Sequence, residues 1–149
     1  MPSAVLSYFL APEAREKGLA VKAPRRSDAG LDLPALEDTV IPPGELFAVR
    51  TGVHLAIPEG FVGLVRDRSS MALRGAVTVA GVIDASYRGE VKVLMHNLSR
   101  EPLELRTGER IAQCVIVPHF QADETVEVAA LDQLGQTERG TGGFGSTGK

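Results

Sequence analysis

Turn-forming residues interrupt this chain at short intervals, and this spacing limits the possible fold more than any other feature. The 149 residues include 16 glycines and 9 prolines, and signals such as Pro42-Pro43-Gly44 and Pro58-Glu59-Gly60 separate short apolar runs. A strand needs only about four to eight residues, whereas a helix usually needs about ten or more. Strands that recur about every eight to twelve residues predict an all-β fold, a jelly-roll type of barrel or sandwich.

We predict strands in the apolar runs between these turns. The expected strands cover residues 4–10, 31–33, 46–49, 53–57, 61–65, 77–79, 82–83, 90–97, 103–105, 110–117 and 126–128. The run Ile111 to Val117 is the most continuously apolar, as expected of a strand that is buried on both faces. One short helix is expected at Ser69 to Arg74 with a serine as its N-cap, while the polar residues 12–22 fit a helical turn or a loop.

Length, charge and cysteine content exclude several classes of protein. The length suits one domain, and a net charge of −3 gives no field that would attract nucleic acid or a membrane. No apolar run is long enough to span a bilayer, so we expect a soluble cytoplasmic protein. The single cysteine, Cys114, excludes an intramolecular disulfide and is expected to be an inert core thiol. The three histidines lack the spacing of metal ligands.

The composition changes near the C-terminus. We expect residues 1–132 to form the β domain and residues 133–149 to form a flexible glycine-rich arm, because ordering glycine is costly in entropy. The arm combines Arg139 with the hydroxyls of Ser146 and Thr147, which suit an anion. Phe144 has no local apolar partner, so it either closes over a flat ligand or is an idle aromatic on a disordered tail.

The stretch Gly81 to Glu90 contains a carboxylate and an aromatic in one hairpin. Val82 and Ile83 lead into Asp84, and Tyr87 follows three residues later. Such a hairpin suits a small-molecule pocket in which the acid does the chemistry and the ring forms a wall. The alternative is a surface turn whose aspartate only caps the backbone.

Three further positions have both a structural and a functional interpretation. Arg68-Ser69-Ser70 could hold a phosphate at the start of the short helix, or could be an ordinary cap with a solvated arginine. Gln113 lies inside an apolar run, so its amide either bonds to backbone or reaches a ligand. Asp32 could cap a turn or face the water shell of a metal ion.

In order, these pieces resemble the five motifs of the trimeric dUTPase family, the deoxyuridine 5'-triphosphate nucleotidohydrolases. The matching segments are Ala29–Leu33, Arg68–Ala72, Gly81–Glu90, Gly108–Gln113 and Arg139–Gly148. The sequence departs from the commonest pattern at Asp67, where proline or glycine is frequent, and at Ser86, where a second aspartate is frequent. A uracil-facing side-chain amide also has no clear counterpart here.

The resemblance implies a role for each matching residue. Asp84 is the base that activates a water for attack on the α-phosphorus, and Tyr87 lies against the deoxyribose and excludes a 2′-hydroxyl. The backbone of Gly81, Val82 and Ile83 pairs with uracil. The remaining substrate-binding residues are Arg68, Ser69, Ser70 and Gln113 at the phosphates, Lys92 near the substrate, Phe144 on the base, and Arg139, Gly145, Ser146 and Thr147 at the β- and γ-phosphates. Asp32 contacts Mg²⁺ through water.

The resemblance also implies a jelly-roll homotrimer with sites shared between subunits. The implied reaction converts dUTP to dUMP and pyrophosphate with Mg²⁺, which keeps uracil out of DNA and supplies dUMP for dTMP synthesis. A dCTP deaminase shares the fold and the Arg68-Ser69-Ser70 pattern, but the run after Asp84 and the fifth motif favour hydrolysis. A non-catalytic nucleotide sensor is the second alternative, and the presence of Asp84 disfavours it.

Overall fold

The computed structural model describes residues 5–122 and 124–143. Within these residues it contains eleven strands, two short α-helices and one 3₁₀ helix. In chain order they are β1 (Ser7–Leu10), α1 (Pro12–Glu16), β2 (Gly30–Pro34), β3 (Thr39–Ile41), β4 (Leu46–Val49), β5 (Val53–Ala56), β6 (Phe61–Asp67), α2 (Ser69–Leu73), β7 (Ala76–Thr78), β8 (Val82–Ile83), β9 (Val93–Asn97), β10 (Leu103–Leu105), β11 (Arg110–Pro118) and η1 (Leu131–Leu134).

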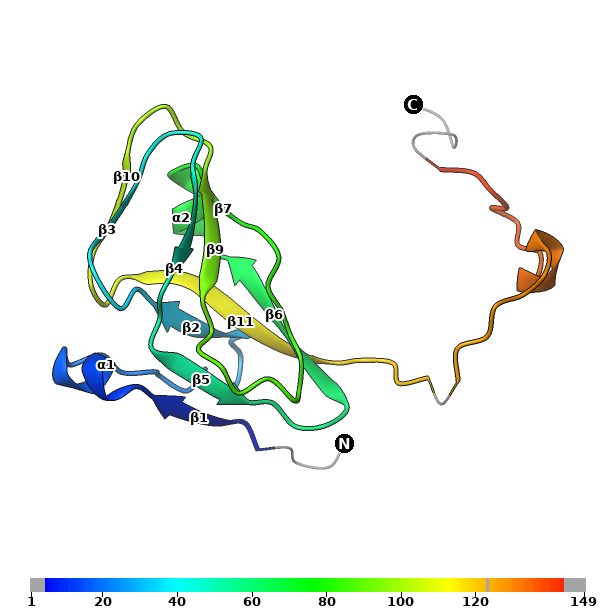
Figure 1. Ribbon diagram of the computed structural model, residues 1–149, viewed down its shortest axis with the longest axis horizontal. Helices are drawn as coiled ribbons and strands as arrows, with labels where there is room; N and C mark the ends of the chain where they lie inside the picture. Colours follow the sequence, from blue (N-terminus) through cyan, green and yellow to red (C-terminus); the bar gives the residue numbers. More distant parts are fainter. Residues whose placement is uncertain (1–4, 123, 144–149) are drawn as a thin grey trace.

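The strands pair antiparallel in four small sheets. The sheet orders are β1-β5, β3-β10, β4-β9-β7 and β2-β11-β6-β8. Figure 1 shows these sheets stacked into one body, with α2 lying beside β7. The all-β, jelly-roll-like prediction is confirmed, although the pairings among the described strands form separate sheets and not one closed barrel.

The four-stranded sheet determines which distant residues become neighbours. The central strand β11 pairs with β2, so that Gln113 faces Asp32, and with β6, so that Gln113 faces Arg66. The short strand β8 pairs with the other side of β6 through Gly63–Ile83 and Leu64–Val82, and it forms the edge of this sheet. Segments that are far apart in the sequence therefore meet along one surface.

A continuous apolar core lies between the sheets. Strand alternation places residues such as Leu33, Ile41 and Met95 inside with no exposed surface. Met71 anchors α2 to this core and is 2% exposed, which stabilises the fold by about 1.5–3 kcal/mol. Because the helix is only five residues long, its position depends on this packing and not on helical propensity.

A tight bend between β4 and β5 packs against α1. Gly52 has φ +69°, and a Cβ at this position would lie 2.8 Å from the Cβ of Ala14, which has no exposed surface. Ala11 donates its N–H to the carbonyl of Gly52 at 2.8 Å. The bend is therefore held on one side by the core and has little room to move.

The structure differs from the sequence predictions at the helices. There are two short α-helices where one was predicted, because the polar segment after residue 12 forms α1 with Pro12 in its first turn. The predicted serine N-cap is wrong. The N-cap of α2 is Arg68, in extended conformation with φ −93° and ψ 140°, and no side chain caps this end.

Two strand predictions also need correction. Residues 126–128 form no strand in the described chain; Val126 is 66% exposed and lacks a neighbouring strand to pair with. The run of β11 is not buried throughout: Ile111, Ala112 and Cys114 are buried, while the other residues from Gln113 to Val117 are half-buried. In this single chain β11 is therefore covered on one face only.

After β11 the chain leaves the sheets. Figure 1 shows residues 120–122 and 124–143 running away from the strands, and η1 exposes Leu131 and Leu134 by 72% and 70%. The expected boundary between residues 132 and 133 falls inside η1 and stays a prediction. Among the described residues, no helix is long and apolar enough to cross a membrane.

Candidate active site

A polar pocket lies where β2, β11 and the start of α2 meet. Its volume is about 480 Å³, and most of its lining residues carry charged or hydrogen-bonding side chains. The lining consists of Ser27, Asp28, Ala29, Gly30, Asp32, Arg68, Ser69, Ser70, Arg110 and Gln113. The pocket thus brings together five of the predicted site residues from three separate motifs: Asp32, Arg68, Ser69, Ser70 and Gln113.

Asp32 lies between two guanidinium groups. Arg68 Nε lies 3.1 Å from Asp32 Oδ1, and Arg110 Nη1 lies 3.2 Å from Asp32 Oδ2. Arg68 also donates to the carbonyl of Arg110 at 3.0 Å. Asp32 lies within β2, so the expected turn-capping role is wrong, and the aspartate instead fixes the orientation of both arginines.

Gln113 is fixed from two sides. Its Nε2 donates to the carbonyl of Asp67 at 3.0 Å. Its Oε1 lies so close to Gly30 that a Cβ at that glycine would be only 2.7 Å away. The amide therefore bonds to backbone and also lines the pocket, while its contact with a ligand stays a prediction.

The first residues of α2 form another wall. Met71 and Ala72 both donate their N–H to the carbonyl of Arg68, so Ser69 and Ser70 precede the first intrahelical hydrogen bond. The N–H groups at such a helix start have no intrahelical acceptor and, like the serine hydroxyls, can donate to an anion.

The hairpin after β8 presents Asp84 and Tyr87 to solvent. The N–H of Tyr87 donates to the carbonyl of Asp84 at 3.1 Å, which closes the turn. The side chain of Asp84 is exposed, and Tyr87 is 44% exposed. The hydroxyl of Tyr87 donates to the carbonyl of Glu90 at 2.9 Å, so the ring lies across Gly89, where a side chain would clash with it.

The start of the hairpin approaches β6 closely. Gly81 has φ +96°, and a Cβ at this position would lie 2.8 Å from the Cβ of Val65. Val65 donates its N–H to the carbonyl of Gly81 at 2.8 Å. One side of Val82 and Ile83 pairs with β6, and no described strand pairs with the other side.

In the single chain, Asp84 does not lie in the polar pocket. It continues β8 beyond the pair between Ile83 and Gly63, whereas Arg68 follows the opposite end of β6. The stretch of β6 between Gly63 and Arg68 spans about 16 Å, at about 3.3 Å per residue. The pocket and the hairpin are therefore two separate half-sites.

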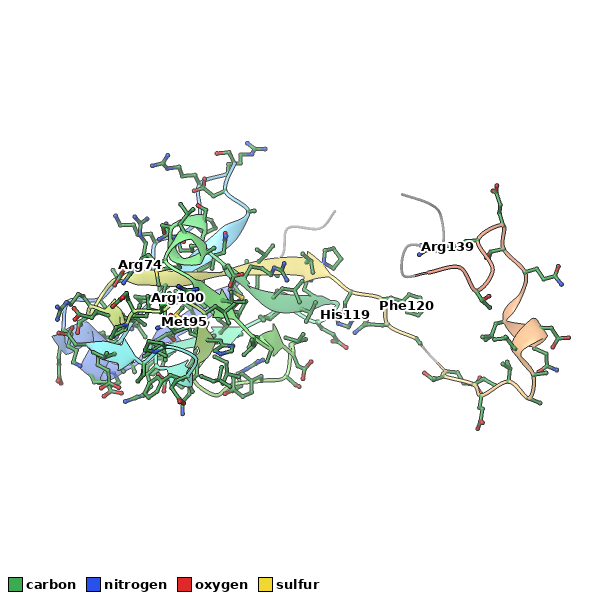
Figure 2. The ribbon with its side chains drawn as sticks, turned by 90° about the horizontal axis from the view of Figure 1, so that it is seen from above. Arg74, Met95, Arg100, His119, Phe120 and Arg139 are labelled. Carbon is green, nitrogen blue, oxygen red and sulfur yellow. The ribbon has the colours of Figure 1, made fainter. Side chains whose placement is uncertain are left out.

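Arg139 is the one C-terminal candidate that the structure describes, and it lies apart from both half-sites. Figure 2 shows Arg139 on the segment that runs away from the sheets, where its Nε donates to the carbonyl of Gly142 at 2.8 Å. Phe144, Gly145, Ser146 and Thr147 lie outside the described residues. Their roles stay predictions.

Two other sequence candidates have simple surroundings. Lys92 is exposed between the buried residues Val91 and Val93, on the outer side of the segment that follows the hairpin. Cys114 is 1% exposed, and burial raises the pKa of its thiol to about 11, so the expectation of an inert core cysteine is confirmed.

Sequence reasoning missed two residues. Arg110 lines the pocket and pairs with Asp32. In the sequence it is an arginine at the start of an apolar strand, where a solvent-exposed side chain is expected. Glu90 accepts hydrogen bonds from the N–H groups of Thr51 and Gly52 at 3.1 and 2.9 Å. These partners are far from Arg110 and Glu90 in the sequence, so no local sequence pattern predicts them. They become visible only in the folded structure.

The described residues contain no cluster of three or more His, Cys, Asp or Glu side chains that could hold a metal ion. Both oxygens of Asp32 are occupied by guanidinium groups. This donor set does not form a protein cage, but it fits a Mg²⁺ ion that keeps its waters and takes ligands from a bound phosphate chain.

Comparisons with known proteins agree on one family. A model described as dUTPase matches residues 17–148. The deoxyuridine 5'-triphosphate nucleotidohydrolase of Nautilia profundicola is 47% identical over 124 residues, which cover 81% of this chain and 84% of the relative.

Solved structures give the same result. The Staphylococcus bacteriophage 80alpha dUTPase with dUPNHPP has a TM-score of 0.82 and 30% identity, covering 99% of this chain and 100% of that chain. A mutant dUTPase from phage phi11 of S. aureus, described for its coordination of a structural Mg(II) ion, has a TM-score of 0.76 and 25% identity, covering 87% of this chain and 99% of that chain.

Proposed function

Because the chain belongs to the dUTPase family, we propose that it hydrolyses dUTP to dUMP and pyrophosphate. The observation that carries this proposal is the polar pocket, where Arg68, Gln113 and the two serines of α2 converge from distant motifs. A triphosphate has about four negative charges, and a site for it needs fixed donors aimed at its oxygens. This pocket supplies them from the start of α2 and from β11.

The proposed base is Asp84. Its exposed carboxylate can accept a proton from a water molecule and so generate the nucleophile that attacks the α-phosphorus. The P–O bond to the β-phosphate breaks, and the two terminal phosphates leave as pyrophosphate. The N–H of Tyr87 bonds to the carbonyl of Asp84 at 3.1 Å and closes the turn, and the carboxylate of Asp84 is exposed.

Tyr87 and the edge of β8 would select the nucleoside. The ring of Tyr87 is fixed over Gly89 and offers a flat wall against which a deoxyribose packs and a 2′-hydroxyl does not fit. Backbone groups on the unpaired side of Gly81, Val82 and Ile83 offer donors and acceptors to the edge of uracil. Cytosine presents the opposite pattern, so the same backbone would reject it.

Magnesium has a defined place in this proposal. The related phage phi11 protein is described with a Mg(II) ion, and the pocket here fits an ion held by substrate phosphates and by waters that contact Asp32. When bound, Mg²⁺ would neutralise phosphate charge that develops during the reaction. Arg68 and Gln113 would still determine how the phosphate chain lies.

The separation of the two half-sites supports a homotrimer with shared sites. A single chain spaces Arg68 and the hairpin about 16 Å apart along β6, which favours a site in which one dUTP contacts the pocket of one subunit and the hairpin of another. The exposed Val126 segment and the arm that leaves the sheets also suit contacts with a neighbouring subunit. Arg139 and the fifth-motif residues after it would then complete a site on another chain.

The decisive experiment compares pyrophosphate release from dUTP, UTP, dCTP and dTTP. We expect turnover with dUTP and at least about a hundredfold less with the others, because sugar and base are each selected. Ammonia release from dCTP without pyrophosphate would support the deaminase alternative. Nucleotide binding without any product would support the sensor alternative, and either result contradicts the proposal.

Shared sites can be tested by complementation. A subunit with Arg68→Ala still carries an intact hairpin, and a subunit with Asp84→Asn still carries an intact pocket. Co-expression of the two with different affinity tags, followed by tandem purification, should restore a substantial part of the turnover at dUTP concentrations below the wild-type KM, where each variant alone turns over little. Inactive mixed oligomers would show that each site is built within one chain.

A further inference from the structure

We infer that Glu90 is a positioning residue that fixes the root of the Asp84–Tyr87 hairpin and thereby sets its discrimination between deoxyribose and ribose. This inference rests on the proposed function. Glu90 directly follows the hairpin, and its side chain is only 14% exposed. It does not line the polar pocket, so any effect on the reaction passes through the hairpin.

Both oxygens of the Glu90 carboxylate accept hydrogen bonds. Its Oε1 accepts from the N–H groups of Thr51 and Gly52 at 3.1 and 2.9 Å, and its Oε2 accepts from Arg50 Nε at 3.1 Å. These three donors belong to consecutive residues of the bend between β4 and β5. A carboxylate is the one side chain that accepts on both oxygens, and such charge-assisted bonds are strong.

The bend to which Glu90 binds is itself packed into the core. Thr51 has no exposed surface, and its hydroxyl donates to the carbonyl of Val91 at 2.5 Å. Gly52 packs against Ala14 with no room for a side chain. The carboxylate therefore ties the hairpin to the core of the protein and not to another surface loop.

The backbone of Glu90 holds the tyrosine. The hydroxyl of Tyr87 donates to the carbonyl of Glu90 at 2.9 Å, and His54 forms a bridge with Glu90 on the other side. The side chain thus anchors to the core the same residue whose carbonyl orients the ring. If the anchor is lost, the carbonyl and the ring move together.

Electrostatics agree with this geometry. Burial raises the pKa of Glu90, but hydrogen bonds from Gly52, Arg50 and Thr51 outweigh this effect, so the pKa lies below its ordinary value of 4.5. The group is therefore charged at neutral pH, when all three bonds are made.

The test is the ratio of kcat/KM for dUTP to kcat/KM for UTP, because this ratio does not depend on the folded fraction. Glu90→Ala should lower the ratio by about tenfold, since a small displacement of a positioning group is costly. Glu90→Gln should keep it within about threefold of the wild type, because the amide oxygen can still accept from Thr51 and Gly52.

Glu13→Gln is the matched control. Glu13 is the other carboxylate paired with Arg50, and its side chain is 47% exposed. This variant removes the same charge from the same arginine without touching the hairpin, so the ratio should stay at the wild-type value. An equal loss in Glu13→Gln would assign the effect to the charge of Arg50 and overturn the inference.

Failure of the inference is distinguishable from failure of the proposed function. A lower melting temperature of Glu90→Ala with an unchanged ratio would reduce Glu90 to a purely structural role. If Glu90→Ala does not fold, Glu90→Asp decides, because its shorter side chain keeps the charge but recedes from the bend; an unchanged ratio there also overturns the inference. Wild-type protein that releases no pyrophosphate from dUTP would overturn the proposed function, and the inference with it.

Discussion

The polar pocket and the hairpin hold their polar groups in different ways. In the pocket the side chains hold one another, as Asp32 does with Arg68 and Arg110. In the hairpin the backbone holds the turn and leaves the carboxylate of Asp84 exposed. Binding of a charged group needs donors arranged in advance, whereas a base needs an oxygen without a competing partner. Changes in the pocket should therefore affect binding of the phosphates, and changes at Asp84 should affect turnover.

Asp84→Asn should give the largest effect and separates the two functions most clearly. The amide cannot accept the proton, so kcat should fall by about a thousandfold or more. The dissociation constant for dUTP should change by no more than about threefold, since the pocket is intact. Pyrophosphate release and equilibrium binding measure the two quantities, and equal turnover by both proteins would remove Asp84 from the chemistry.

Arg68→Ala should show the reverse pattern. Loss of a charged donor to phosphate should raise KM for dUTP by about 10- to 100-fold, with a smaller change in kcat. Arg74→Ala is the matched control: this arginine caps the same helix and pairs with Glu109, outside the pocket. If both variants raise KM equally, the effect comes from the stability of α2 and not from phosphate binding.

Gly30→Ala should have a smaller effect on the pocket. The backbone of Gly30 is not strained, but the added methyl would meet Gln113 Oε1 and displace the amide. We expect KM for dUTP to rise by about three- to tenfold, the value of a neutral hydrogen bond. In a Gln113→Ala background the same substitution should add almost nothing. Additive effects in the double variant would contradict this coupling.

The smallest effect concerns the stability of the hairpin root in acid. The pKa of Glu90 is depressed in the folded protein, so its contribution is fully present above the ordinary value of 4.5 and is lost as the pH falls through the folded value. Chemical denaturation between pH 6 and about pH 3 should show this loss, about 1 kcal/mol or less. Glu90→Gln should flatten this part of the profile.

Local sequence signals predicted the strands well because turns are local. The predicted strands that begin at residues 46, 53, 61 and 103 match β4, β5, β6 and β10 closely. The predicted strand at residues 126–128 failed because pairing depends on a partner strand, which the described part of this chain does not offer there. The sequence pattern indicates that a segment favours an extended conformation. Whether it joins a sheet depends on a neighbouring strand with an unpaired edge.

The pocket could be assembled only through the family resemblance. Asp32, Arg68 and Gln113 each had a plausible structural interpretation, and periodicity gives no strand register. The register of β11 between β2 and β6 brings them together. Arg110 stayed unnoticed because an exposed strand start favours arginine, and Glu90 because two of its partners are backbone N–H groups of residues 51 and 52.

The pairing of Asp32 with two arginines also affects which anions the pocket can bind. An incoming phosphate meets guanidinium groups that an internal carboxylate already neutralises in part. A monovalent ion such as chloride gains little from displacing or sharing that carboxylate, whereas a polyphosphate offers several charges at once. We therefore expect the pocket to prefer polyphosphates to small monovalent anions.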